Sequence, residues 1–205
     1  HELAKKNVVV ITVAYRQGIF GAFVHPEITD QSGLDKSGNF FLLDLIAGLE
    51  WIQENIDVFG GDPSNVTIFG ESAGAANIGY LSVSPPARDL FNRAIKQSGG
   101  FEINHDYANP YEEQKELGLG FAKMLGLSTL AQLRATPADE IHSKAMTYYG
   151  DHSYNAKRKN FFAIIDDYVM PDTPAQMIAG GKIHPADYLL GSNADENLMY
   201  TPSTV

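Results

Sequence analysis

Along the chain, runs of consecutive apolar residues alternate with stretches in which apolar side chains recur at helical spacing. Residues 7–15, NVVVITVAY, form the first such run. A β-branched run without alternation is typical of a strand buried on both faces of a parallel sheet. Over residues 39–58 the apolar side chains recur every three or four positions, which predicts a long helix. We expect Gly60 and Gly61 to end this helix, because glycine readily adopts the backbone of a helix terminus.

Shorter apolar runs continue the pattern in the rest of the chain. Three of them predict further strands, at residues 66–70, 92–99 and 186–193. Between the first two of these strands, residues 72–84 are predicted to form a helix, which Pro85 and Pro86 are expected to end.

The remaining segments complete the predicted architecture. Residues 111–148 have helical spacing, with breaks expected near Gly126 and Pro137. Residues 16–39 are rich in glycine, aspartate and serine, which predicts a long irregular connection. Strands and helices that alternate in this order predict an α/β fold with a mostly parallel sheet flanked by helices and right-handed crossovers.

Composition narrows the class of protein. The 205 residues, of which 44% are hydrophobic and 20% charged, suit an ordinary globular domain. The net charge of -10 disfavours nucleic acid and anionic membranes as partners, and no apolar run reaches the ~18 residues of a membrane span. The absence of cysteine excludes disulfides and thiolate catalysis but leaves both a cytoplasmic and a secreted location open. Without a phosphate-binding loop or ligand-like spacing of histidines and carboxylates, we expect no metal and no cofactor.

A candidate nucleophile lies in the sequence GESAG, residues 70–74, between a predicted strand and a predicted helix. The pattern G-x-S-x-G at such a junction places the serine, here Ser72, on a sharp and strained turn that exposes its oxygen. We expect Gly70 and Gly74 to be glycines because side chains at these positions would collide where the strand and the helix nearly touch. The first N–H groups of the helix point at the same spot, so the Ala73 N–H is the predicted oxyanion donor. The alternative is a glycine-rich bend without chemistry.

The segments around this motif resemble a known family. Residues 39–81, NFFLLDLIAGLEWIQENIDVFGGDPSNVTIFGESAGAANIGYL, are similar to the central signature of the type-B carboxylesterases, the family that contains the cholinesterases. Four other segments match in the family's order: VAYRQGIFGAF, RAIKQSGG, LRATPADEI and GGKIHPADYLLGSNADEN. The match is looser over residues 101–160 as a whole. The resemblance implies an α/β-hydrolase fold and a Ser–Glu–His triad that cleaves carboxylic esters through an acyl-enzyme intermediate.

By this resemblance, Ser72 matches the nucleophile and Glu196, in GSNADEN, matches the triad acid. The acid would hold the histidine in the useful tautomer and stabilise its protonated form. Asp195 is the neighbouring competitor, but the family's spacing favours Glu196. The alternative for Glu196 is a surface carboxylate in a polar turn. Asn197 stands where the family usually has glycine, a mild departure because asparagine also tolerates a left-handed backbone.

Two further positions carry over as neighbours of the triad. Glu71 matches a glutamate that lies beside the nucleophile and lines the pocket in the family. Ser98, in KQSGG, matches a serine that helps to orient the acid and the histidine. A purely structural role is the alternative for both. Trp51 is expected to lie in the core, on the long helix.

The triad histidine has no candidate in the chain. The fold orders its triad as serine, acid and histidine, and every histidine precedes Glu196: His1, His25, His105, His142, His152 and His184. The glycine-rich loop that completes the oxyanion hole would precede residues 7–15. We therefore expect residues 1–205 to be a partial α/β-hydrolase domain with both flanks missing, which alone hydrolyses esters feebly or not at all. Missing sheet neighbours also predict exposed edges and self-association.

Three functions are compatible with these residues. The first is a serine carboxylesterase that acts on a small-molecule ester. The second is a non-catalytic cholinesterase-like binding or adhesion module; such relatives typically lack the nucleophile, whereas this chain has Ser72. The third is another α/β-hydrolase activity, such as peptide or lactone cleavage, because the same turn serves these reactions. No motif specifies the acyl or alcohol part of a substrate.

Overall fold

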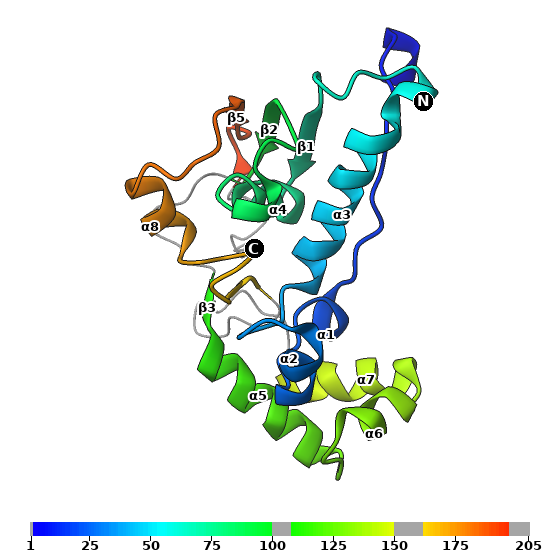
Figure 1. Ribbon diagram of the computed structural model, residues 1–205, viewed down its shortest axis with the longest axis vertical. Helices are drawn as coiled ribbons and strands as arrows, with labels where there is room; N and C mark the ends of the chain where they lie inside the picture. Colours follow the sequence, from blue (N-terminus) through cyan, green and yellow to red (C-terminus); the bar gives the residue numbers. More distant parts are fainter. Residues whose placement is uncertain (1, 100–107, 150–161, 197–205) are drawn as a thin grey trace, which may run out of the picture.

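The computed structural model describes residues 2–99, 108–149 and 162–196. A three-stranded parallel sheet lies towards one end of the molecule and a group of helices lies at the other (Figure 1). The strands follow the order β1-β2-β5: β1 (Thr67–Glu71), β2 (Arg93–Gln97) and β5 (Asp187–Gly191). Each corresponds to one of the short apolar runs, so the predicted mostly parallel sheet is confirmed.

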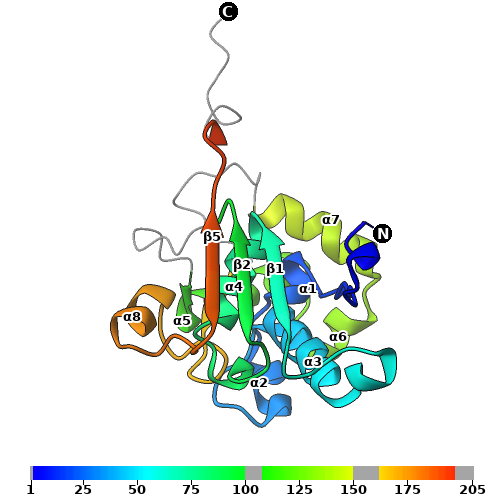
Figure 2. The ribbon, with the colours of Figure 1, turned by 90° about the horizontal axis from the view of Figure 1, so that it is seen from above.

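One face of the sheet is covered and the other is open. Helix α4 (Ala73–Leu81) packs on β1 and β2, and Figure 2 shows it behind the strands. On the opposite face, Phe69, Ile95 and Leu189 lie in register across the three strands. The Phe69 side chain is 53% exposed and that of Leu189 is 62% exposed, so no described helix covers these two side chains.

The long helix predicted over residues 39–58 is confirmed. Helix α3 (Phe40–Asn55) packs against α4 and continues into the 3-10 turn η2 (Ile56–Phe59). Gly60 ends this turn with a φ of 79°, as its position in the sequence predicted. Five side chains at helical spacing form the buried face of α3: Phe41, Leu42, Ile46, Leu49 and Ile52.

Two apolar features that were expected to be buried are exposed. Residues 7–15 form no strand, and the Val8 side chain is 51% exposed. The run lies along α3, where Val13 contacts Gly48, and it pairs with no described strand. The strand prediction is wrong because β-branched residues favour extended backbone but do not supply the neighbour that stabilises a strand. The prediction that Trp51 lies in the core is also wrong, since 45% of its side chain is exposed.

The segment predicted as an irregular connection, residues 16–39, contains two short helices: α1 (Gly18–Gly21) and α2 (Pro26–Ser32). Pro26 occupies the first position of α2, and His25 Nδ1 accepts a hydrogen bond from the Glu27 N–H at 3.3 Å. Gly33 ends the helix with a φ of 72°. Proline at the first position and glycine after the last are helix signals, so the prediction of irregular structure was wrong here.

The helices at the lower end of Figure 1 surround a second core: α5 (Tyr111–Met124), α6 (Leu130–Ala135) and α7 (Ala138–Tyr149). The predicted breaks near Gly126 and Pro137 are confirmed, and Gly126 has a φ of 72°. Thr129 starts α6 through reciprocal hydrogen bonds with Gln132. Phe121 is completely buried at the centre of this core.

Several short elements were not predicted: β3 (Asn109–Pro110), β4 (Ile164–Ile165), α8 (Pro174–Ala179), η1 (Ala4–Lys6) and η3 (Pro85–Ala87). Elements of two to six residues carry too little periodicity to be recognised. Asn39, buried at the start of α3, holds β4 in place. Its amide donates to the Ile164 carbonyl at 2.7 Å and to Asp166 at 2.8 Å, and its oxygen accepts from the Ile164 N–H at 2.8 Å.

Candidate active site

Ser72 is the one residue between the end of β1 at Glu71 and the start of α4 at Ala73. Its φ of 52° and ψ of -115° lie outside the regions that residues with a side chain normally adopt. Such strain persists only where the surroundings enforce it. Here the Ser72 N–H donates to the Gln97 carbonyl of β2 at 2.9 Å, and the Ser72 carbonyl accepts from the Ala76 N–H at 3.0 Å. The predicted strand–turn–helix junction is therefore present.

The close approach of β1 and α4 explains Gly70 but not Gly74. A Cβ added at Gly70 would lie 2.7 Å from the carbonyl carbon of Gly74, whereas a Cβ at Gly74 would meet no described atom within 4 Å. The steric reason expected for Gly74 is therefore wrong for the described residues. Gly99, which the sequence did not single out, is more tightly constrained. A Cβ there would lie 2.6 Å from Ala75 Cβ and 2.9 Å from the backbone carbonyl oxygen of Ser72.

The start of α4 carries the N–H groups expected at an oxyanion site. No side chain caps this helix, and its first residue, Ala73, is exposed. The N–H groups of a first helical turn have no acceptor within the helix, and the positive end of the helix dipole lies there. An ester carbonyl presented to Ser72 would therefore meet hydrogen-bond donors. The specific role of the Ala73 N–H stays a prediction.

Glu196 and Ser98 are brought together, although 98 positions separate them in the sequence. Glu196 Oε1 accepts hydrogen bonds from the Ser98 hydroxyl and, at 2.8 Å, from the Asn193 N–H. These two donors, the Ser98 hydroxyl first, hold the pKa of Glu196 below its ordinary value. The Ser98 N–H in turn donates to the Gly191 carbonyl at 2.8 Å. The contact with Ser98 is made by Glu196 and not by the competitor Asp195.

These groups all follow the carboxyl ends of the parallel strands, which point the same way in Figure 2. Ser72 comes directly after β1, Ser98 comes directly after β2, and Glu196 comes after β5. Ligands of open α/β sheets bind at this edge. Glu71, the last residue of β1, is exposed next to Ser72 in the chain, and its role in lining a pocket stays a prediction.

The described residues supply neither a general base nor a metal site. His184 precedes β5 and so lies at the opposite end of the sheet, His142 is exposed on α7, and His25 caps α2. The other three histidines lie outside the described residues: His1, His105 and His152. Within the described residues, no cluster of three or more histidine, aspartate or glutamate side chains is placed to hold a metal ion.

In the same part of the chain, no helix combines the length and apolar character needed to cross a membrane.

One buried charge near the candidate site was missed. Lys96, in the middle of β2, is only 2% exposed, and its Nζ lies against Gly79 of α4, where an added Cβ would be 2.9 Å away. The sequence contained a signal for this buried charge, because Lys96 is a charged residue inside a predicted strand. Because a buried ammonium is stable only when it is compensated, Lys96 belongs to the structure beneath α4 and not to the solvated surface.

Known proteins match the chain along its whole length. The sequence profile described as the carboxylesterase family matches residues 1–205. Fumonisin B1 esterase from Sphingopyxis macrogoltabida is 38% identical over 200 residues, which are 97% of this chain and 35% of that protein. Para-nitrobenzyl esterase from Bacillus subtilis (strain 168) is 34% identical over 98% of this chain and 40% of its own length. A solved structure of a thermophilic PNB esterase has a TM-score of 0.83 and 32% identity, covering 100% of this chain and 41% of that one.

The chain thus spans between 35% and 41% of the length of these three relatives. A solved PNB esterase structure has a TM-score of 0.78 over 93% of this chain, and these structural neighbours have the α/β-hydrolase fold. Profile, sequence and structure agree over the same residues, and they agree with the fold expected from the GESAG turn. The chain therefore belongs to the carboxylesterase family and has the α/β-hydrolase fold.

Proposed function

We propose that residues 1–205 are the central part of a serine carboxylesterase domain, in which Ser72 is the nucleophile and Glu196 is the triad acid. One observation carries this proposal: Ser72 has a φ of 52° between a strand and a helix, at the sheet edge where Ser98 binds Glu196. A bend without chemistry requires neither a strained serine nor a carboxylate fixed by a second side chain. The triad histidine is a residue outside this chain.

The proposed reaction transfers an acyl group first to Ser72 and then to water. The Ser72 oxygen bonds to the ester carbonyl carbon while its proton passes to the histidine, and the Ala73 N–H stabilises the resulting oxyanion. The bond to the alcohol then breaks, and the alcohol leaves with the proton from the histidine. Water repeats the sequence on the acyl-enzyme and releases the acid. Glu196 is ionised at neutral pH, and the Ser98 hydroxyl and the Asn193 N–H favour this ionised form, which is the form that stabilises an imidazolium.

The names of the relatives support a small-molecule carboxylic ester as the substrate. Fumonisin B1 esterase and para-nitrobenzyl esterase are both named as esterases, each for a different ester. The match therefore supports the ester bond as the site of attack and selects neither an acyl group nor an alcohol.

The geometry also bears on the two alternatives. A non-catalytic binding module has no need to retain Ser72 in a strained turn or to fix Glu196 by a hydrogen bond from Ser98. Peptide or lactone cleavage would use the same turn, and no observation on the described residues favours either reaction over ester cleavage. The carboxylesterase is therefore the function that the site supports best.

Covalent labelling of the full-length gene product by a fluorophosphonate probe tests the proposal. We expect stoichiometric labelling at Ser72 and a loss of roughly a thousandfold or more in labelling rate in Ser72→Ala. Ser143→Ala, which removes an exposed hydroxyl on α7, should label like the wild type. A wild type that does not react would favour the binding module, and equal labelling of Ser72→Ala would overturn the assignment. Turnover of p-nitrophenyl esters beside peptide and lactone substrates separates the esterase from the other hydrolases.

A further inference from the structure

His184 connects the start of β5 to the end of α4. Its N–H donates to the Ser82 carbonyl at 2.8 Å, just beyond the last residue of α4. Its own carbonyl accepts from the Ala186 N–H at 2.9 Å and from the Tyr188 hydroxyl at 3.1 Å. The backbone of this one residue therefore fixes the turn that leads into β5.

The His184 ring fills a buried site against the ring of Phe91. Only 3% of the residue is exposed, and the ring packs against Phe91 with a centroid distance of 5.8 Å. Both ring nitrogens are buried without a hydrogen-bond partner among the described residues, and so is the hydroxyl of Ser84 nearby. A neutral imidazole is tolerated in such a site, whereas a charged one without a partner is strongly disfavoured.

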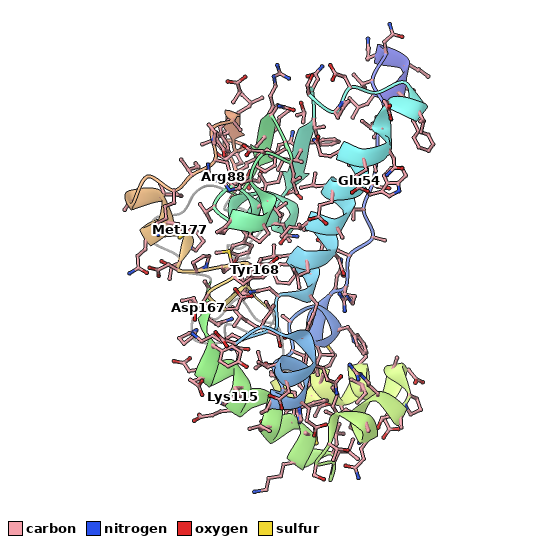
Figure 3. All side chains as sticks on the ribbon, viewed as in Figure 1. Glu54, Arg88, Lys115, Asp167, Tyr168 and Met177 are labelled. Carbon is pink, nitrogen blue, oxygen red and sulfur yellow. The ribbon has the colours of Figure 1, made fainter. Side chains whose placement is uncertain are left out.

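The charged and titratable groups around the ring do not offset this cost. Burial is the main cause that lowers the pKa of His184, and the positive charge of Arg88 (labelled in Figure 3) lowers it further. The Ser84 backbone and the Asp89 carboxylate act in the opposite direction and are the smaller effects. Arg88 and Asp89 are both exposed, so solvent screens both charges and burial remains the main cause. From β5, Tyr188 faces the residue with a hydroxyl that burial keeps neutral, because burial raises its pKa.

We propose that His184 is a pH-sensitive lock on the start of β5: the neutral ring stays packed on Phe91, and the protonated ring leaves the site and releases the 182–186 turn. The geometry carries this inference, since a proton on either nitrogen would place a charge in a buried site against the Phe91 ring, where no described side chain accepts a hydrogen bond from it. Nothing in the carboxylesterase reaction requires this device. It lies at the amino end of the sheet, away from Ser72 and Glu196.

The direction of the pH effect follows from the lowered pKa. In the unfolded chain His184 has its ordinary pKa of about 6.5, and in the folded chain its pKa is lower. The folded state therefore binds fewer protons than the unfolded state, so the stabilisation is complete above about pH 6.5 and is lost as the pH falls towards the folded pKa. Between the two pKa values, the unfolding equilibrium constant should rise about tenfold for each unit by which the pH falls.

The lock also bears on the far end of β5, and this consequence rests on the proposed function. From Gly191, the chain continues to Asn193 and Glu196, and Gly191 accepts the hydrogen bond that fixes Ser98. Release of the strand at its start would therefore loosen the carboxylate at its end. Acid would then weaken the candidate site through the start of β5 as well as through Glu196 itself.

Urea unfolding of the chain between about pH 5 and pH 8 tests the lock. His184→Gln keeps a polar group that does not titrate, and His184→Phe replaces the ring by an apolar one. His142→Gln is the matched control, because His142 is exposed on α7. We expect the unfolding equilibrium constant of the wild type and of the control to rise as the pH falls. In both His184 variants this rise should be smaller, by about a factor of ten for each pH unit between the unfolded and the folded pKa of His184. Equal pH slopes for all four proteins would overturn the proposal.

Two further measurements keep the test decisive if a variant fails to fold. A ¹H NMR titration of the wild-type imidazole should give His184 a pKa below 6.5, and a value at or above 6.5 would contradict the lock. Deuterium uptake by residues 182–191 at about pH 5.5 should be faster in the wild type and in His142→Gln than in His184→Phe, and equal uptake in all three proteins would contradict the lock. These readouts involve no substrate, so failure of the lock and failure of the esterase proposal are separate results.

Discussion

At the residue scale, the candidate site is marked by two serines whose backbones adopt a positive φ, Ser72 at 52° and Ser98 at 53°. Each follows directly after one of two adjacent parallel strands. A side-chain-bearing residue in such a conformation costs about 1–3 kcal/mol and is found most often at functional sites. The two strained turns place a hydroxyl at the end of β1 and another at the end of β2, where the second binds Glu196.

The Ser98 hydroxyl is expected to control the ionisation of Glu196. In Ser98→Ala the pKa of Glu196 should rise towards its ordinary value, because the largest of the interactions that lower it is removed and the Asn193 N–H remains. Carboxyl ¹³C NMR of the chain measures this shift. In the full-length protein, the rate of fluorophosphonate labelling should fall on the order of 10- to 100-fold, as expected when an acid loses its orientation. Ser192→Ala, an exposed serine of the same segment, should change neither quantity, and an unchanged Glu196 pKa in Ser98→Ala would contradict the assignment.

At the element scale, α4 can pack closely on β1 because Gly70 has no side chain at the point where the two elements meet. Gly70→Ala should destabilise the chain by about 1–3 kcal/mol, because its Cβ would lie 2.7 Å from the backbone of Gly74 and force β1 and α4 apart. Gly74→Ala adds the same methyl group where no described atom lies within 4 Å, within a helix that favours alanine, so stability should rise by up to about 1 kcal/mol. Urea unfolding compares the two. Equal losses would show that the close approach at Gly70 is not what shapes the turn.

At the scale of the whole molecule, features determined by nearby residues were predictable and those determined by distant ones were not. The helix over residues 39–58 and the turn at residues 70–74 depend on spacing and glycines within a few turns. The contact of Ser98 with Glu196 joins positions 98 apart, and it was available only through the family resemblance. The strand expected at residues 7–15 failed for the same reason, because β-propensity does not identify a partner strand. The buried polar contacts of Asn39 likewise link residues more than a hundred positions apart.

The open face of the sheet leads to a prediction about the chain as a whole. Phe69, Ile95 and Leu189 form an apolar row across it, and β1 and β5 are the outer strands of the described sheet. Exposed apolar patches and strand edges both promote association, so the chain should self-associate as its concentration rises from low to high micromolar in sedimentation velocity. Leu189→Lys should weaken association about tenfold or more, because the ammonium would have to lose its water in the contact. Leu119→Lys makes the same substitution at a side chain that is 42% exposed on α5, at the other end of the molecule from the sheet (Figure 1), so it should leave association unchanged. A chain that stays monomeric at every concentration, or equal effects of the two substitutions, would show that this face does not mediate contacts between copies.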